Sequence, residues 1–214
     1  NVVPAGSGND SPQRFAIESM SRFLSQKGKE TDKEKWEDMC ISYVNSKSDA
    51  GIKDFFMKQL QIVGGPKSAA AMKIYLNDKE LCEPALAVMA VADPASAETY
   101  FADALKNQQL PCASSLMNHL GSLGSDKAVN EYITWANSDD VTIKAAAYRA
   151  LAMSGDVRAN KILSEAAKKA FYNWEPTGST ESLLRYAEVT GQKGNIKGSD
   201  KICKLIMSVC DEET

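Results

Sequence analysis

The chain has 214 residues, with 25 basic and 28 acidic side chains and a formal net charge of -3. This balance argues against a nucleic-acid partner, because nucleic-acid-binding proteins present a basic surface that releases counterions. A single histidine excludes a multi-histidine metal site. No apolar run approaches the roughly 20 residues needed to cross a bilayer. We therefore expect no nucleic acid, no membrane span, no metal and no cofactor.

Residues 1–10 contain Pro4, Gly6, Ser7 and Gly8 without apolar periodicity, and they are predicted to be a linker. Residues 11–214 are expected to form one domain. Within it, apolar side chains recur at helical spacing, and no comparable window shows the alternation of a strand. The pattern predicts twelve helices in six pairs: 11–27 and 32–46, 49–63 and 66–77, 80–91 and 94–107, 110–123 and 126–137, 140–153 and 157–172, 179–190 and 199–210.

The helix boundaries are predicted from residues with known positional preferences. Proline is tolerated in the first turn of a helix, where its missing N–H has no partner. We therefore expect Pro66, Pro94 and Pro111 in first turns. Short polar side chains such as Asp156 cap helix N-termini, and glycines such as Gly155 close the preceding helix in a left-handed conformation.

The middle of the chain repeats itself. Segments that begin at Leu86, Met117 and Tyr148 superpose at a constant offset of 31 residues, and a fourth copy begins at Met57, offset by 29. Each copy contains an apolar helical run, a break at Gly or Asp, a small residue and a second helical run. A helix pair cannot bury its apolar stripe alone, so such repeats form a continuous core by stacking.

The segment from Ser138 to Leu163 resembles HEAT-type repeats, in particular the short form named after phycobilin lyases. The residues that carry the resemblance are Asp139 or Asp140, Val141, the Ala145-Ala146 pair, Leu151, Gly155-Asp156 and Leu163. Clear resemblance covers about residues 48–170, with caps at both ends. It implies an all-α, right-handed α-α superhelix of about six antiparallel helix pairs, in which second helices line a concave face. It indicates architecture and not function.

A partner on that concave face would contact second-helix positions outside the apolar stripe. The side chains at these positions are mixed in charge and mostly short, which suits a polar or protein partner. We expect the contacts to come from Lys73, Asp103, Asn130, Thr134 and Lys161.

The five cysteines, Cys40, Cys82, Cys112, Cys203 and Cys210, are odd in number, widely spaced and free of any Cys-x-x-Cys pair. Cys203 and Cys210 lie two helical turns apart, beyond the reach of a disulfide. We expect the cysteines to be small buried apolar side chains and not a disulfide framework or a zinc site.

Other conspicuous residues have two possible roles each. His119 has no orienting acid on its own helix and is expected to be structural and not catalytic. Asp139-Asp140 is expected to cap a helix and not to bind a metal. The aromatic cluster of Phe171, Tyr172 and Trp174 beside Pro176 is expected in the core, with an exposed interaction patch as the alternative. Tyr132 and Trp135, on the periodic apolar face, are also expected in the core.

No nucleophile–base pair, phosphate loop or metal cluster is visible in the sequence. We therefore expect a non-catalytic helical-repeat module for interaction or scaffolding, within a longer protein, that contacts a protein partner or an adjacent domain of the same chain. The alternative is a helical accessory domain of an exported glycoside-hydrolysing enzyme, from a loose likeness to bacterial exported proteins with such helices before a β-sandwich domain. That alternative favours a periplasmic or otherwise exported location. A chromophore lyase, suggested by the name of the repeat, is a third hypothesis.

Overall fold

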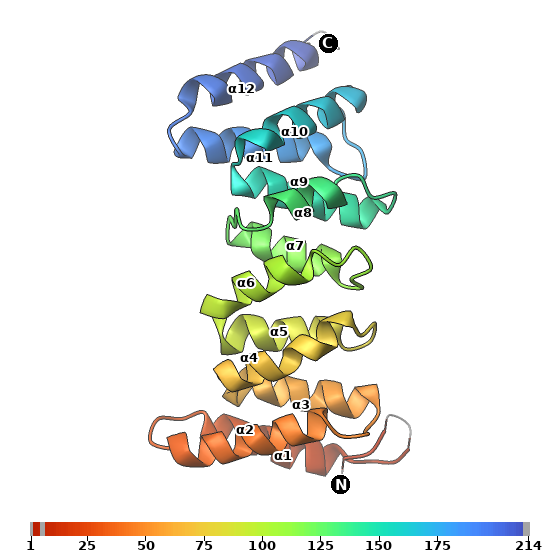
Figure 1. Ribbon diagram of the computed structural model, residues 1–214, viewed down its shortest axis with the longest axis vertical. Helices are drawn as coiled ribbons and strands as arrows, with labels where there is room; N and C mark the ends of the chain where they lie inside the picture. Colours follow the sequence, from red (N-terminus) through yellow and green to blue (C-terminus); the bar gives the residue numbers. More distant parts are fainter. Residues whose placement is uncertain (1, 5–6, 212–214) are drawn as a thin grey trace. The chain divides into compact units, whose positions relative to one another are not determined.

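The computed structural model describes residues 2–4 and 7–211 (Figure 1). Within these ranges the chain forms twelve α-helices and one short 3-10 helix, and no strand. The prediction of an all-α protein is confirmed for this part of the chain. In the same ranges, no helix has the length and apolar character needed to span a bilayer.

The chain divides into two compact units. The N-terminal unit holds residues 1–100 and 110–112, and the C-terminal unit holds residues 101–109 and 113–214. The division falls within α6 (Pro94–Ala104). Each unit has its own buried apolar side chains, so each is described separately.

In the N-terminal unit, every helix packs on a helix of the next or the preceding pair. Its elements are α1 (Ser11–Leu24), α2 (Glu30–Val44), α3 (Ala50–Val63), α4 (Pro66–Met72), the 3-10 helix η1 (Lys73–Asn77) and α5 (Cys82–Ala92). The first helices α1, α3 and α5 pack in succession, while α2 packs on α3 and α4 on α5. Fully buried side chains include Phe56, Met57, Leu60 and Met89. These side chains form the core of this unit.

The C-terminal unit repeats this arrangement. Its elements are α7 (Ala113–Ser122), α8 (Val129–Trp135), α9 (Val141–Ser154), α10 (Val157–Lys169), α11 (Ser179–Gln192) and α12 (Ile196–Asp211). The helices α7, α9 and α11 pack in succession, with α8 on α9 and α10 on α11. Tyr132 and Trp135 are buried, which confirms their predicted place in the core.

Polar contacts recur at the spacing of one repeat. The Tyr75 hydroxyl donates to the carbonyl oxygen of Val44 at 2.8 Å, across 31 residues. The Trp135 indole N–H donates to the carbonyl oxygen of Leu105 at 3.0 Å, across 30 residues. The last carbonyl groups of a helix have no N–H partner within that helix. In both cases a buried aromatic side chain, about 30 residues further along the chain, donates a hydrogen bond to such a carbonyl. Each of these two hydrogen bonds therefore ties a helix pair to the preceding pair.

Most predicted boundaries agree with the structure because they depend on local capping. The Asp140 side chain accepts the backbone N–H groups of Thr142 and Ile143, and Asp156 caps α10 in the same way. Gly155 has a φ of 64°, the left-handed conformation expected at a helix C-terminus. The prediction for Pro111 is wrong, since α7 begins two residues later.

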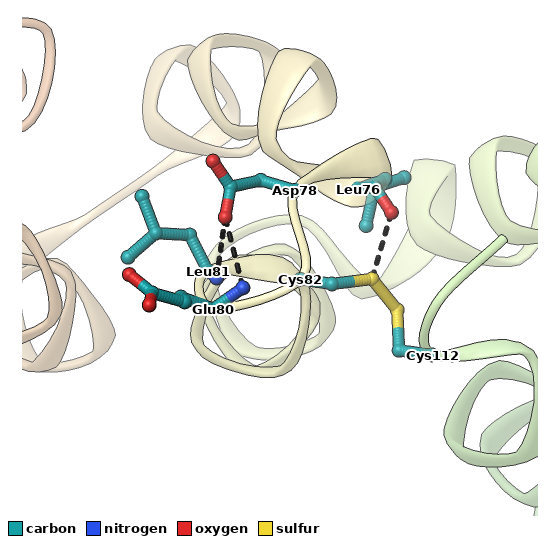
Figure 2. The surroundings of a disulfide bond; sticks show 6 residues. All are labelled: Leu76, Asp78, Glu80, Leu81, Cys82 and Cys112. Carbon is teal, nitrogen blue, oxygen red and sulfur yellow. Dashed lines mark hydrogen bonds between the residues drawn. A yellow bond between two sulfur atoms is a disulfide. The ribbon is translucent and has the colours of Figure 1, made fainter. Parts of the chain in front are cut away.

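The prediction that the cysteines are unpaired apolar side chains is wrong for one pair. Cys82 and Cys112 are joined by a disulfide bond, with Cα atoms 6.0 Å apart, within the usual range for a disulfide (Figure 2). They are 30 residues apart, close to the 31-residue repeat. The prediction had considered only the short spacing between Cys203 and Cys210 as a possible disulfide. Cys40 is buried and free, and burial, with a contribution from the nearby Glu37 charge, raises the pKa of its thiol to about 12.

The two remaining cysteines lie on α12. Cys203 is free and half-buried, so its thiol is not part of the core. The prediction for the side chain of Cys210 lies outside the described part of the structure.

Candidate functional site

An exposed aromatic loop in the C-terminal unit is the most unusual surface feature of this protein. We call residues 170–178, between α10 and α11, the aromatic loop. The side chain of Trp174 is 88% exposed and that of Phe171 is 77% exposed. The prediction that this cluster lies in the core is wrong for both residues, because their side chains are exposed. Only Tyr172 is half-buried.

The backbone of this loop is strained. Phe171 and Tyr172 have φ values of 54° and 57°, in the left-handed region that bulky residues rarely adopt. Such a conformation costs roughly 1–3 kcal/mol per residue and concentrates at functional sites. The Tyr172 N–H donates to the carbonyl oxygen of Ala167 at 2.9 Å, as in a helix C-cap where glycine is usual. A phenylalanine at this place lowers stability and gains no burial in return.

Glu175 holds the second half of the loop in place. Its carboxylate accepts the backbone N–H groups of Thr177 at 2.6 Å and Ser179 at 2.7 Å, and the Thr177 hydroxyl at 2.7 Å. Burial alone would raise the pKa of Glu175, but these hydrogen bonds outweigh it and lower the pKa to about 2. The ionised carboxylate therefore ties Trp174 and Pro176 to the start of α11.

Two shallow hollows flank Glu175 and Thr177. One, of about 180 Å³, is lined by Arg149, Trp174, Pro176 and Glu181 among others, and the other, of about 330 Å³, includes Lys144, Tyr148 and Lys169. The side chains of Lys144, Arg149 and Lys169 make no hydrogen bond or ion pair with the described residues. Three cations available for a ligand therefore surround the base of the aromatic loop.

The five residues predicted to contact a partner are all exposed, and none of them lines the two hollows around Glu175. Lys73, on η1, places its Nζ 3.4 Å from the centre of the Tyr100 ring. Asp103, on α6, pairs with Lys106 at 2.7 Å. Each is engaged with a neighbour of its own unit, and neither lines the hollows around Glu175.

The structure brings two of the predicted residues together. On α8, the Thr134 hydroxyl donates to the backbone carbonyl of Asn130 at 3.0 Å. The Asn130 side chain accepts from Arg158 of α10 at 2.7 Å, a neighbour that the sequence analysis missed. Lys161, also on α10, lies 4.0 Å from Glu165. Their role in binding stays a prediction.

Neither Arg149 nor Glu175 was predicted from the sequence to belong to a site. Glu175 lies four residues before the start of α11 and precedes Pro176 and Gly178. These two turn-forming residues were the only local sign in the sequence of a turn at this place. His119 packs edge-on against Phe101, with ring centres 5.2 Å apart, and burial lowers its pKa. Within residues 2–4 and 7–211, no group of three or more His, Cys, Asp or Glu side chains is placed to hold a metal ion.

No family model, curated protein or solved structure matches this chain.

Replacing Glu175 with glutamine is expected to reduce the hydrogen-exchange protection of the Thr177 and Ser179 amides about tenfold. The change removes a charge-assisted acceptor, and such hydrogen bonds contribute about 1.5 kcal/mol or more. Because folding lowers the pKa of Glu175, its contribution is present above the ordinary value of 4.5 and is lost as the pH falls toward 2. Protection factors measured against pH should show this loss.

Glu181→Gln is the matched control, because Glu181 faces the same hollow but accepts none of these hydrogen bonds. Equal protection in Glu175→Gln and the wild type would show that the carboxylate does not anchor the loop.

Proposed function

We propose that this chain is a non-catalytic helical-repeat module that binds a protein partner, or an adjacent domain of the same polypeptide, through the aromatic loop. The observation that carries the proposal is the exposure of Phe171 and Trp174 on a strained backbone that Glu175 anchors. Tryptophan and arginine are enriched among the residues that dominate binding at protein interfaces. A loop already fixed in shape loses little conformational entropy on binding.

The proposed scaffold is a HEAT-like superhelix of about six helix pairs. The 31-residue period of the sequence supports it, together with the repeat-spaced contacts of Tyr75 and Trp135. In such an arrangement each pair contacts its neighbours, and connecting loops are free to carry binding residues. The aromatic loop is such a connection.

The chemistry around the loop specifies the partner. Arg149 presents a planar fork of donors that matches a carboxylate, and it lines the same hollow as the Trp174 ring. Lys144 and Lys169 add positive charge on the other side of Glu175. The partner segment therefore carries an Asp or Glu beside an apolar side chain, so that the carboxylate pairs with Arg149 and the apolar group packs on Trp174.

The disulfide favours a second, compatible role, as an accessory domain of an exported enzyme. Disulfides persist in oxidising compartments and are rare in the cytosol. The partner would then be a catalytic domain of the same polypeptide. Mass spectrometry of the protein isolated from its source with thiols blocked at lysis should find Cys82 and Cys112 linked, whereas alkylation of both would contradict an exported location.

Peptide selection tests the proposed binding surface. Random peptides displayed on phage and selected on the immobilised wild-type protein should be enriched in Asp or Glu next to Leu, Phe or Trp. Trp174→Ala should weaken binding of the selected peptides about thirtyfold, the effect of losing an interface residue worth about 2 kcal/mol. Arg149→Gln should weaken the acidic peptides selectively.

Phe15→Ala is the control, because Phe15 is an equally exposed aromatic residue on α1 in the other unit. Selected peptides that bind Trp174→Ala and the wild type with equal affinity would refute the proposal.

A further inference from the structure

A cavity in the N-terminal unit shares no lining residue with the two hollows beside the aromatic loop. It is a groove of about 610 Å³ between α1, α2 and α3, with walls that include Ile17, Trp36, Met39, Tyr43 and Phe56. Binding sites for small ligands usually have volumes of roughly 300–1,000 Å³ and mostly apolar walls. By size and lining, the groove is therefore suited to bind an apolar group.

Internal contacts fix the walls of the groove. The Tyr43 ring stacks on the Phe56 ring, with centres 4.3 Å apart and planes 7° from parallel. The indole N–H of Trp36 donates to the Ser21 hydroxyl at 2.9 Å, so this ring contributes an apolar surface with its polar atom already satisfied. The groove is thus formed before any ligand enters.

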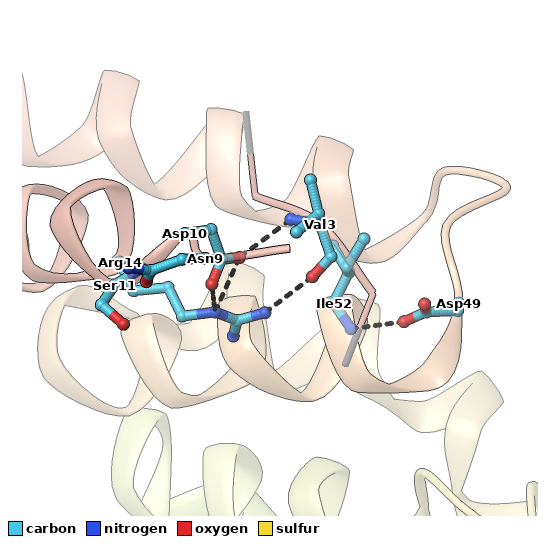
Figure 3. A network of polar contacts seen from close by, with 7 residues as sticks. All are labelled: Val3, Asn9, Asp10, Ser11, Arg14, Asp49 and Ile52. Atoms are coloured by element: carbon cyan, nitrogen blue, oxygen red, sulfur yellow. Dashed lines mark hydrogen bonds and ion pairs between the residues drawn. The ribbon is translucent and has the colours of Figure 1, made fainter. Parts of the chain in front are cut away.

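A segment of the chain itself that is in no helix lies at the groove. We call residues 2–4 the strap, and Val2 is one of the residues that line the groove. The next residue, Val3, is held by both of its backbone polar groups (Figure 3). Its N–H donates to Asp10 at 2.9 Å, and its carbonyl oxygen accepts from Arg14 at 3.0 Å.

Asp10 and Arg14 act together as a clamp on the peptide backbone. The Arg14 Nε donates to the Asp10 carboxylate at 2.9 Å, and its guanidinium carbon lies 4.7 Å from the centre of the Phe55 ring on α3. The Asp10 carboxylate is therefore placed to accept the N–H of one residue, and the Arg14 guanidinium is placed to donate to the carbonyl oxygen of the same residue. Pairing of main-chain groups, with pockets for side chains, is how extended peptides are recognised.

We propose that this groove is a binding site for an extended apolar peptide, in which Asp10 and Arg14 hold the backbone of one residue and the aromatic walls receive the neighbouring side chain. The strap occupies the site in part, and about 610 Å³ remains open beside Val2. The strap shows the chemistry of the ligand: small β-branched side chains followed by proline, with no charge. A peptide of this kind from another chain binds by displacing the strap.

A labelled peptide with the sequence acetyl-Asn-Val-Val-Pro-Ala-amide is the probe. Its binding to the full chain is measured by fluorescence anisotropy, and the indole N–H signal of Trp36 is followed by NMR. Val2→Ser should increase the affinity for the probe about tenfold, because the strap loses the apolar contact of a valine and competes less well. Arg14→Gln in the Val2→Ser background should abolish this gain.

Two controls keep the test specific. Phe15→Ala changes an exposed aromatic residue on the same helix, next to Arg14, and should leave probe affinity unchanged. A probe with both valines replaced by serine should not bind. The proposal is overturned if the probe fails to bind Val2→Ser, if Arg14→Gln leaves the affinity unchanged, or if binding does not move the Trp36 signal.

Discussion

Replacing Glu37 with alanine is expected to lower the free energy of unfolding by about 3 kcal/mol. Glu37 lies on α2 and is only 8% exposed. Its Oε1 atom accepts the Gly65 N–H at 2.9 Å, the Ser68 N–H at 3.1 Å and the Ser68 hydroxyl at 2.6 Å. The two N–H groups lie at the start of α4, where a helix offers them no backbone acceptor. Ser68 is itself fully buried. In the alanine variant, the Gly65 N–H and the two Ser68 donors would have no acceptor and no access to water. A buried donor without a partner destabilises a fold more than the loss of an exposed hydrogen bond does.

The measurement is urea denaturation followed by far-ultraviolet circular dichroism, with the wild-type slope as a check that unfolding stays cooperative. Asp38→Ala is the matched control, because Asp38 is the next residue and pairs with Lys67 at the exposed surface. Exposed ion pairs contribute about 0–1 kcal/mol, so this control should change stability little. Equal effects of the two substitutions would show that the buried carboxylate has no special role in holding α4.

Removing the disulfide by the double substitution Cys82→Ala and Cys112→Ala is expected to lower the free energy of unfolding by about 3.5 kcal/mol. The bond closes a loop across 30 residues, and the chain-entropy estimate for a loop of this length is of that size. Both half-cystines are buried, so a reductant acts only as the structure around them opens. In the reduced protein the Cys82 sulfur, 2.8 Å from the Leu76 carbonyl oxygen, gains a proton that it can donate there (Figure 2).

Urea denaturation with and without dithiothreitol measures this effect. The midpoint of the wild type should fall on reduction, whereas that of the double variant should not respond. Cys40→Ala is the control, because Cys40 is also buried but free, and this variant should keep the full response to reductant. If the urea midpoint of the wild type did not change on reduction, the disulfide would not stabilise the fold.

The helices could be predicted because their signals are local. The carboxylates of Asp140 and Asp156 lie directly ahead of the helices that they cap, and Gly155 needs only its own freedom at positive φ. The 31-residue period indicated in addition which helices are equivalent. Burial of Tyr132 and Trp135 followed from that period, since their positions repeat on one helix face.

The disulfide and the candidate sites could not be predicted in this way, because they depend on contacts between distant segments. Cys82 and Cys112 are 30 residues apart, and only the packed structure brings their Cα atoms to 6.0 Å. The residues of the strap had the composition of a linker, yet Val3 is held by Arg14, eleven residues away. The aromatic cluster beside Pro176 favoured burial of Phe171, whereas this residue has a left-handed backbone and an exposed side chain.

The repeat-spaced hydrogen bonds constrain how such a chain can grow or shrink. Tyr75 and Trp135 use different chemistry, a phenol and an indole, to reach the same kind of carbonyl one repeat earlier. A deletion that removed one of these donors and kept its acceptor would therefore leave that carbonyl without its partner, whereas removal of both together would not. Each of these hydrogen bonds and the two helix pairs that it joins would therefore be kept or lost as one unit.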